Sequence, residues 1–219
     1  SNIGSPIEAY RKAMKTLGNR LADAVFARVN HEQQKPTFCV VCTVEDADFL
    51  ASGLLDRLLG LGVPAERVKL VCFWNERVRH FSNTIDNLFD IAPTVKSYQE
   101  SMNIGESIII MVKSIISSGC VVKNNLATLI DQTVPERILV ASPVMVEHSQ
   151  HKLEAEFPPN VAKRFEYVTF AIDNEVVNNL VVPGIGGSVY ERLGFTDHHA
   201  YVPEIVRSRR AKFQFAYAQ

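Results

Sequence analysis

The chain has 219 residues, of which 47% are hydrophobic and 21% are charged, and its formal net charge is −1. Its length and composition are typical of one soluble globular domain, and the near-neutral charge argues against a general nucleic-acid-binding protein. No apolar run reaches the roughly 18 residues of a membrane span, and no signal peptide precedes the first expected helix. We therefore expect a cytoplasmic protein without membrane contact.

Apolar spacing divides most of the chain into alternating helices and strands. Residues 6–29 predict a first helix, because apolar side chains recur there every three or four residues. Strands are expected at 38–43, 68–74, 94–98, 108–112, 137–142 and 165–172. Further helices are expected at 49–61, at 121–130 and within 143–157. The alternation predicts an α/β fold with a mostly parallel, Rossmann-like sheet and helices on both faces.

No linker-like stretch interrupts the sequence, so residues 1–219 are expected to form a single domain. Residues 1–35 look like an N-terminal helical extension, since the alternating pattern is complete without them. The helix in this extension carries a wide apolar face made of Ile7, Tyr10, Met14, Leu17, Leu21 and Val25. An apolar face outside the main domain predicts self-association, and we expect a homodimer.

Small and polar residues separate the strand at 108–112 from the helix that follows it. Such a strand–turn–helix connection can direct several unpaired backbone N–H groups, together with the helix dipole, at a phosphate. The candidate phosphate-binding residues are Lys113, Ser114, Ser117, Ser118, Gly119, Cys120 and Val121. An ordinary connection between a strand and a helix would have the same pattern, so both interpretations stay open.

Three acidic residues, Glu45, Asp46 and Asp48, follow the strand at 38–43 in what is expected to be a turn. Carboxylates are favoured at a helix N-terminus, where they cap N–H groups and complement the dipole. Alternatively, Glu45 and Asp46 form a loop that holds Mg²⁺ and pyrophosphate, since carboxylates alone would repel pyrophosphate. Direct contact with ribose hydroxyls or a base is the third interpretation.

A proline and three glycines lie near the C-terminus, in Val182-Pro183-Gly184-Ile185-Gly186-Gly187. Such a backbone turns sharply and is almost bare of side chains, so a flat ligand can approach its N–H and C=O groups. The alternative is a tight surface turn. Within the expected loop at 173–200, the candidate base-binding residues are Val182, Gly184, Ile185, Gly186 and Gly187.

Together, the turn and the glycine-rich segment resemble the type I phosphoribosyltransferases, and among these the uracil phosphoribosyltransferases. Ser118-Gly119 is similar to the Thr-Gly pair that grips the 5-phosphate of phosphoribosyl pyrophosphate in that family, and Val182 to Gly186 is similar to its uracil-binding loop. The resemblance covers roughly residues 37–195. The chain departs from the family at Lys113, which stands where an acidic residue holds ribose hydroxyls, and at Gly187, which replaces an aspartate.

The resemblance implies a role in nucleotide metabolism: transfer of a phosphoribosyl group to a pyrimidine-like nucleobase. Phosphoribosyl pyrophosphate would be the co-substrate and Mg²⁺ a candidate cofactor. The departure at Lys113 supports an alternative, a non-catalytic regulator that binds a nucleotide or phosphosugar. A lysine cannot accept hydrogen bonds from ribose hydroxyls, although it suits an anion. The sequence singles out no catalytic residue.

Overall fold

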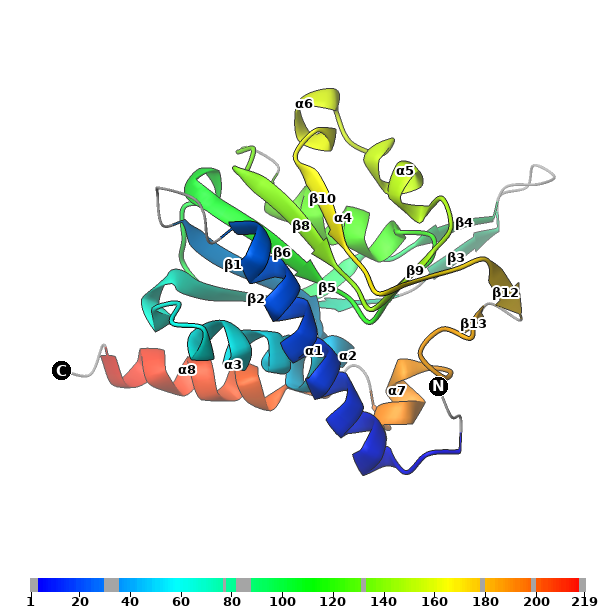
Figure 1. Ribbon diagram of the computed structural model, residues 1–219, viewed down its shortest axis with the longest axis horizontal. Helices are drawn as coiled ribbons and strands as arrows, with labels where there is room; N and C mark the ends of the chain where they lie inside the picture. The colour runs from blue at the N-terminus through cyan, green and yellow to red at the C-terminus, as the bar shows by residue number, and fades with distance from the viewer. Residues whose placement is uncertain are drawn as a thin grey trace.

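A six-stranded sheet forms the centre of the protein (Figure 1). The computed structural model describes residues 4–29, 36–76, 78–81, 88–130, 133–177, 180–197 and 200–216. In spatial order the strands of this sheet are β10 (Phe165–Val168), β8 (Arg137–Ala141), β6 (Ser107–Val112), β1 (Thr37–Thr43), β2 (Val68–Asn75) and β5 (Thr94–Gln99). All neighbouring strands are parallel except β5, which runs antiparallel to β2.

Three smaller sheets accompany the central one. Their strands are β11 (Ala171–Asp173), β9 (Val144–Val146) and β7 (Ile115–Ile116) in one sheet, β12 (Glu175–Val177) with β13 (Leu180–Val182) in the second, and β3 (Val78–Phe81) with β4 (Leu88–Ile91) in the third. The β11–β9–β7 sheet extends the central sheet, because its strands follow β10, β8 and β6 in the chain and lie in the same spatial order. The second is an antiparallel hairpin at the edge of the molecule (Figure 1).

Helices cover both faces of the central sheet. They are α1 (Ile7–Val29), α2 (Val44–Asp46), η1 (Ala47–Ala51), α3 (Ser52–Gly60), η2 (Ala65–Arg67), η3 (Ile104–Glu106), α4 (Cys120–Leu129), α5 (Ser149–Glu154), α6 (Pro159–Ala162), α7 (Val189–Leu193) and α8 (Glu204–Ala216). Helices α1, α3 and α8 lie on one side of the sheet, and α4, α5 and α6 lie on the other (Figure 1). The expected α/β fold is therefore confirmed.

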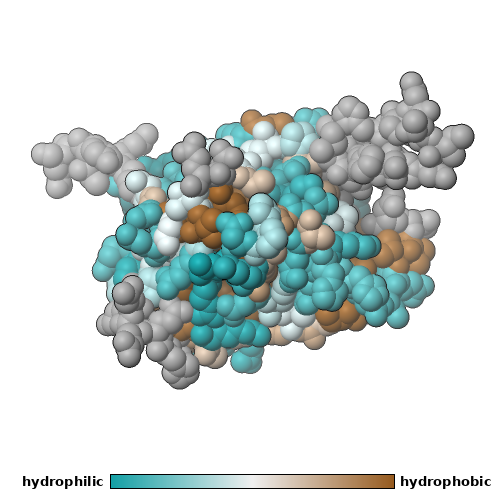
Figure 2. Space-filling view, turned by 90° about the horizontal axis from the view of Figure 1, so that it is seen from above, coloured by the Kyte–Doolittle hydropathy of each residue, from teal (hydrophilic) through white to brown (hydrophobic). Residues whose placement is uncertain are grey.

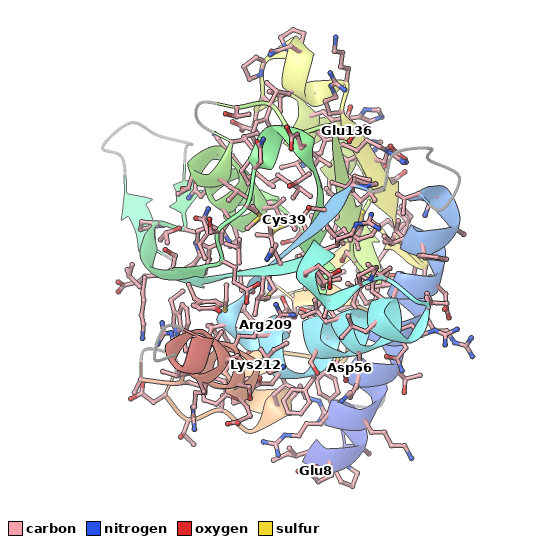
Figure 3. All side chains as sticks on the ribbon, turned by 90° about the vertical axis from the view of Figure 1, so that its left-hand side faces the viewer. Glu8, Cys39, Asp56, Glu136, Arg209 and Lys212 are labelled. Atoms are coloured by element: carbon pink, nitrogen blue, oxygen red, sulfur yellow. The ribbon has the colours of Figure 1, made fainter. Side chains whose placement is uncertain are left out.

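The alternation of side chains along each strand produces two hydrophobic cores. Cys42 of β1 belongs to the core under α1 and α3, whereas Cys39 belongs to the core under α4. Both thiols are free and fully buried, and Figure 3 shows Cys39 among the strands near the centre of the molecule. The sequences of β1, β2 and β6 are almost continuously apolar because these strands are buried on both faces.

Two local expectations are corrected by the structure. Residues 44–48 do not form a turn, because α2, η1 and α3 make one continuous helical segment from Val44 to Gly60. The segment 143–157 begins with strand β9 before α5, since Val144 and Met145 pair with β7 and Val144 to Val146 pair with β11. Helix α8, with its basic residues, was not among the expected helices.

The first helix is part of the core and is not an extension. Leu21, Ala22 and Val25 of α1 are fully buried, and α1 packs closely along η1 and α3. Glycines make this contact tight: a Cβ on Gly18 would lie 2.0 Å from the carbonyl oxygen of Leu50. The apolar face proposed for self-association is thus largely occupied by the chain's own core.

None of the described helices is long and apolar enough to cross a membrane.

Candidate functional site

The phosphate-turn candidate and the glycine-rich segment line one pocket at the carboxyl ends of β1 and β6. Its volume is about 290 Å³. Its polar residues are Glu45, Lys113, Ser117, Ser188 and Tyr190, and its other lining residues are Ile115, Leu180, Val181, Ile185, Gly187 and Val189. Ligands of open α/β sheets bind at this edge, beyond the carboxyl ends of the strands.

A buried ion cluster forms one end of the pocket. Nζ of Lys113 lies 2.8 Å from Oε1 of Glu45 and 2.8 Å from Oδ2 of Asp46. The carboxylates follow β1 and the lysine follows β6, and these strands are direct neighbours. The side chain of Asp46 is fully buried, whereas that of Glu45 retains 13% exposure and reaches the pocket.

The cluster keeps Lys113 and Glu45 charged. Burial alone would lower the pKa of Lys113, but the attraction of Asp46 and Glu45 raises it above its ordinary value. For Glu45, burial opposes ionisation, yet the charge of Lys113 holds its pKa below the usual range. Burial raises the pKa of Asp46. Of the two carboxylates, Glu45 is therefore the one that is favoured in its ionised form, and it is also the one that lines the pocket.

Neighbouring hydroxyl groups fix the two carboxylates. Tyr190 of α7 donates to Oε2 of Glu45 at 3.1 Å, and Thr43 at the end of β1 donates to Oδ2 of Asp46 at 3.2 Å. The charges of Asp46 and Lys113 also act on the hydroxyl of Tyr10 in α1. Burial and the field of Asp46 raise the pKa of its hydroxyl to about 12. The first helix thus contributes to the surroundings of the site.

The turn between β7 and α4 presents free backbone groups. Within the described part of the chain, no hydrogen bond joins the N–H groups of Ser117, Ser118 or Gly119 to another residue. Gly119 has φ +78° and precedes the first residue of α4, whose first N–H groups have no partners inside the helix. Ser117 lines the pocket, so this end can supply donors to an anion.

The remaining phosphate-turn candidates lie elsewhere. Ser114 and Val121 are buried, and the exposed Ser118 contacts Sγ of Cys120 at 3.4 Å. None of these four residues lines the pocket. Lys113 lines it, but its ammonium group is held by two carboxylates and does not lie free for a phosphate. The structure therefore brings Lys113 and Ser117 to the pocket and leaves the other side chains outside it.

The glycines of the C-terminal segment are required by its backbone. Gly184, Gly186 and Gly187 have φ values of +51°, +88° and +109°. A Cβ on Gly184 would lie 2.3 Å from the carbonyl oxygen of Val181, whereas one on Gly187 would meet only the side chain of Arg192, at 3.8 Å. The N–H of Gly184 donates to Asp173 at 2.8 Å. Ile185 and Gly187 line the pocket, while Val182, Gly184 and Gly186 do not.

Sequence reasoning missed Ser188 and Tyr190 as pocket residues. Both follow the glycines directly, at the start of α7, and Tyr190 is the only aromatic residue among the pocket's described lining. Tyr190 could have been predicted as a pocket residue, because it is an aromatic residue close after the three glycines. Its partner Glu45 could not be inferred, because 145 residues separate the two.

A larger apolar groove lies on the other side of Ile185. It has a volume of about 470 Å³ and no charged lining residue. One wall comes from α1 and the residues before it, through Ser5, Ala9, Tyr10, Ala13, Met14 and Leu17. The opposite wall comes from Pro143, Val144, Phe170, Ala171, Gly184 and Ile185. We name this feature the α1 groove.

Comparison with known proteins places the fold. No protein-family model and no curated protein matches the chain. Among solved structures, TT1426 from Thermus thermophilus aligns with a TM-score of 0.50 and 15% identity, over 76% of this chain and 86% of that one.

Two hypoxanthine phosphoribosyltransferases align with TM-scores of 0.44. The enzyme from Trypanosoma cruzi, a mutant complexed with the product IMP, is 10% identical over 76% of this chain and 70% of its own. The enzyme from Staphylococcus aureus is 12% identical over 74% and 76%. At 15% identity the likeness to TT1426 is one of fold, and the chain shares with that protein a mixed α/β domain built on a mostly parallel sheet.

Proposed function

We propose that the protein binds a phosphorylated ribose compound, either a nucleotide or phosphoribosyl pyrophosphate, in the pocket between Ser117 and Glu45. One observation carries the proposal: Ser117, whose N–H has no hydrogen-bond partner in the described part of the chain, lies at one end of the pocket, and the carboxylate of Glu45, paired with Lys113, lies at the other. Donors suit a phosphate, and a carboxylate can only accept hydrogen bonds, which suits sugar hydroxyls.

Glu45 supplies the acceptor that the sequence motif lacks. The motif has Lys113 where an acid was expected, but the neighbouring strand β1 delivers Glu45 to the same end of the pocket. Its two oxygens are oriented by Lys113 and Tyr190, and each retains a lone pair for a further donor. The acidic function would then be moved from one strand to the next.

The apolar walls suit a flat ring. Ile115, Val181 and Ile185 line the pocket between its two polar ends, and the main chain at Gly187 is open. The resemblance of the glycine-rich segment favours a pyrimidine-like base such as uracil. Backbone atoms can bind the edge of such a ring without any particular side chain.

Two functions use this pocket differently. In phosphoribosyl transfer, negative charge at Glu45 would stabilise the cationic ribose that forms as pyrophosphate leaves and the base nitrogen bonds to C1′. In a non-catalytic regulator, the same contacts would hold a nucleotide without turnover. The pairing of Lys113 with both carboxylates favours the second candidate, because it withdraws charge from the ribose side.

The carboxylates do not fit a directly bound Mg²⁺. The ammonium group of Lys113 lies at hydrogen-bonding distance from both Glu45 and Asp46, in the position that a shared cation would take. Among the described residues, no group of three His, Cys, Asp or Glu side chains could hold a metal. We therefore assign no step to a metal ion.

Thermal unfolding with a ligand panel tests the proposal. The panel contains phosphoribosyl pyrophosphate, ribose 5-phosphate, UMP, IMP, uridine and inorganic phosphate. At about 100 times its dissociation constant, a bound ligand adds about 2.7 kcal/mol of stability, or roughly 5–10 °C in a domain of this size. We expect this shift with phosphorylated ribose compounds and a smaller one with uridine. No shift with any of them would reject the proposal.

Matched variants locate the binding. Ser117→Ala and Glu45→Gln should weaken binding, whereas Ser118→Ala, one residue away and outside the pocket, should leave it unchanged. A transfer assay with phosphoribosyl pyrophosphate, Mg²⁺ and uracil, cytosine or hypoxanthine separates the two functions. Turnover identifies the transferase and its base, and binding without turnover identifies the regulator.

A further inference from the structure

A second hollow lies where the beginning of α1, the end of α7 and the beginning of α8 meet, at the lower side of the molecule in Figure 1. Its volume is about 530 Å³. Small-molecule sites have volumes of about 300–1,000 Å³. Arg11, Phe49, Arg207 and residues between Gly194 and Val202 line it, and we name it the Arg207 hollow. The opposite face of the molecule, seen from above in Figure 2, is mainly hydrophilic, with apolar residues in separate spots.

The Arg207 hollow is distinct from the pocket between Ser117 and Glu45. The described linings of the two have no residue in common. Val189 and Tyr190, at the start of α7, line the pocket, whereas Gly194, directly after the end of α7, lines the hollow. A ligand could therefore occupy either one without touching the side chains of the other.

Three aromatic rings form the apolar part of the hollow. Phe49, Phe195 and Tyr201 are each partly exposed. The ring centroids of Phe195 and Tyr201 are 4.3 Å apart, and those of Phe49 and Phe195 are 6.4 Å apart. Partly exposed rings offer stacking or edge contacts to another ring, so this lining suits a flat aromatic ligand.

Two arginines of the hollow are held in fixed orientations. Nε and Nη2 of Arg11 donate to the carbonyl oxygen of Leu193 at 3.1 and 2.8 Å. Nε and Nη2 of Arg207 donate to the carbonyl oxygen of Val202 at 3.0 and 2.8 Å. The guanidinium group of Arg11 also lies over the ring of Phe49, 5.3 Å from its centroid. A guanidinium group has five N–H donors, so each arginine keeps donors for an anion.

The carboxylates beside these arginines are displaceable. Oε1 of Glu8 lies 2.7 Å from Nη1 of Arg11, and Oε2 of Glu204 lies 3.7 Å from Nη1 of Arg207. The side chains of Glu8 and Glu204 are 80% and 73% exposed. Exposed ion pairs contribute only about 0–1 kcal/mol, because water and salt screen them. An anion that binds both arginines can therefore replace these contacts.

Asp48 fixes the wall of the hollow. Its carboxylate accepts hydrogen bonds from the hydroxyl of Tyr201 and from the N–H groups of Glu204 and Ile205 at the start of α8. Asp197, the one acidic residue in the described lining, accepts from the main chain three residues later at 3.0 Å. The rings and the arginines are thus positioned before any ligand arrives, which lowers the entropic cost of binding.

We propose that the Arg207 hollow is a second binding site, and that its ligand is a flat aromatic or heteroaromatic oxyanion. The ring would lie against Phe195 and Tyr201, and its carboxylate or phosphate group would accept hydrogen bonds from Arg11 and Arg207. The two arginines outnumber the one carboxylate of the lining, so the hollow favours an anion. The ring and the charge are both required, because neither set of contacts fills the hollow alone.

Isothermal titration calorimetry tests the proposal on the full chain, with benzoate and phenyl phosphate as probes. We expect both to bind, and inorganic phosphate and benzyl alcohol to bind at least about tenfold more weakly. Arg207→Gln should weaken the binding of both probes about tenfold. The matched control is Arg57→Gln, which removes an exposed arginine of α3 that pairs with Asp23 outside the hollow, and it should bind like wild type. Circular dichroism checks that each variant is folded.

Trp74, the only tryptophan of the chain, reports on the location of the ligand. Its Nε1 donates to the carbonyl oxygen of Tyr201 at 2.9 Å, so binding in the hollow should change its fluorescence. Ser117→Ala should leave the affinity for phenyl phosphate unchanged. The proposal is overturned if neither probe binds, if Arg207→Gln binds like wild type, or if Ser117→Ala weakens binding and Arg207→Gln does not. The last result would place the probe in the pocket between Ser117 and Glu45, whose proposed function stands or falls separately.

Discussion

The hydroxyl of Tyr190 donates a hydrogen bond to Oε2 of Glu45, while Lys113 donates to the other oxygen of the same carboxylate. This relationship joins the helix after the glycine-rich segment to the end of β1. It fixes the orientation of the one carboxylate that faces the candidate pocket. The first prediction tests whether that orientation matters for binding.

Tyr190→Phe should weaken the binding of phosphorylated ribose compounds about tenfold. A hydrogen bond to a charged group contributes about 1.5–3 kcal/mol, and a tenfold change in affinity corresponds to about 1.4 kcal/mol. Isothermal titration calorimetry with ribose 5-phosphate measures the effect. Tyr167→Phe, which removes a hydroxyl bonded to the backbone of Gln150 outside the pocket, is the control. Equal affinities for wild type and Tyr190→Phe would contradict the prediction.

Lys113→Met should reduce the free energy of unfolding by about 3–5 kcal/mol, because it leaves two buried carboxylates without their cation. Urea denaturation measures the loss. The triple variant Lys113→Met, Glu45→Gln, Asp46→Asn removes the uncompensated charge and should recover most of it. If Lys113→Met is as stable as wild type, the ion cluster does not hold these strands together.

Lys113→Asp should abolish binding at the pocket. The substitution restores an acidic residue at the position where the phosphoribosyltransferase motif has one. The sequence alone therefore predicts that Lys113→Asp increases the rate of phosphoribosyl transfer. The structure predicts the opposite, since a third carboxylate would then lie beside Glu45 and Asp46 without a cation. A transfer assay that shows increased turnover for Lys113→Asp would restore the sequence-based interpretation.

The contribution of Glu45 to stability should depend on pH. Its pKa in the folded protein lies below the ordinary value of 4.5, so the stability it provides is present above that pH and is lost as pH falls through the folded pKa. The difference in unfolding free energy between wild type and Glu45→Gln should therefore stay constant at neutral pH and shrink as the pH falls below 4.5. Asp46, whose pKa is raised, acts with the opposite sign. A difference that grows on acidification would refute this assignment.

Gly184→Ala should destabilise the protein by more than about 1 kcal/mol, because a Cβ at a positive φ would also clash with the backbone of Val181. Gly60→Ala, in α3 with nothing within 4 Å of the added carbon, should be neutral or stabilising by up to about 1 kcal/mol. Thermal unfolding compares the two. Gly187→Ala has space for its added carbon, but the φ of +109° strains any side chain there, so we expect it to lose stability as well.

Helices and strands with strong patterns were predictable, and long-range partners were not. The runs in β1, β2, β6 and β8 are fixed by burial on both faces, which the sequence displays directly. Strand β9 was missed because a strand of three residues is too short to show an alternating pattern of apolar and polar residues. The role of α1 was misjudged, because an amphipathic helix looks the same whether its apolar face meets its own sheet or a partner.

In the candidate site, too, local features were predictable from the sequence and long-range contacts were not. Local turn chemistry singled out Ser117 and Gly187, and both line the candidate pocket. The pairing of Lys113 with Glu45 and Asp46 depends on β1 and β6 being neighbours, which spacing along the chain does not reveal. The lysine therefore looked like a free anion-binding group, whereas its ammonium group is paired with two carboxylates.

The contact between α1 and the helical segment after β1 is made by backbone atoms at Gly18 and Gly53. At Gly18 the nearest atom to an added carbon is the carbonyl oxygen of Leu50, and at Gly53 it is that of Lys15, at 2.2 Å. Because backbone meets backbone, side-chain rotation cannot absorb a change in spacing. The distance of Tyr10 from the ion cluster and the width of the α1 groove are therefore set together. Any larger residue at Gly18 or Gly53 would move one end of the candidate pocket and one wall of the groove in a single step.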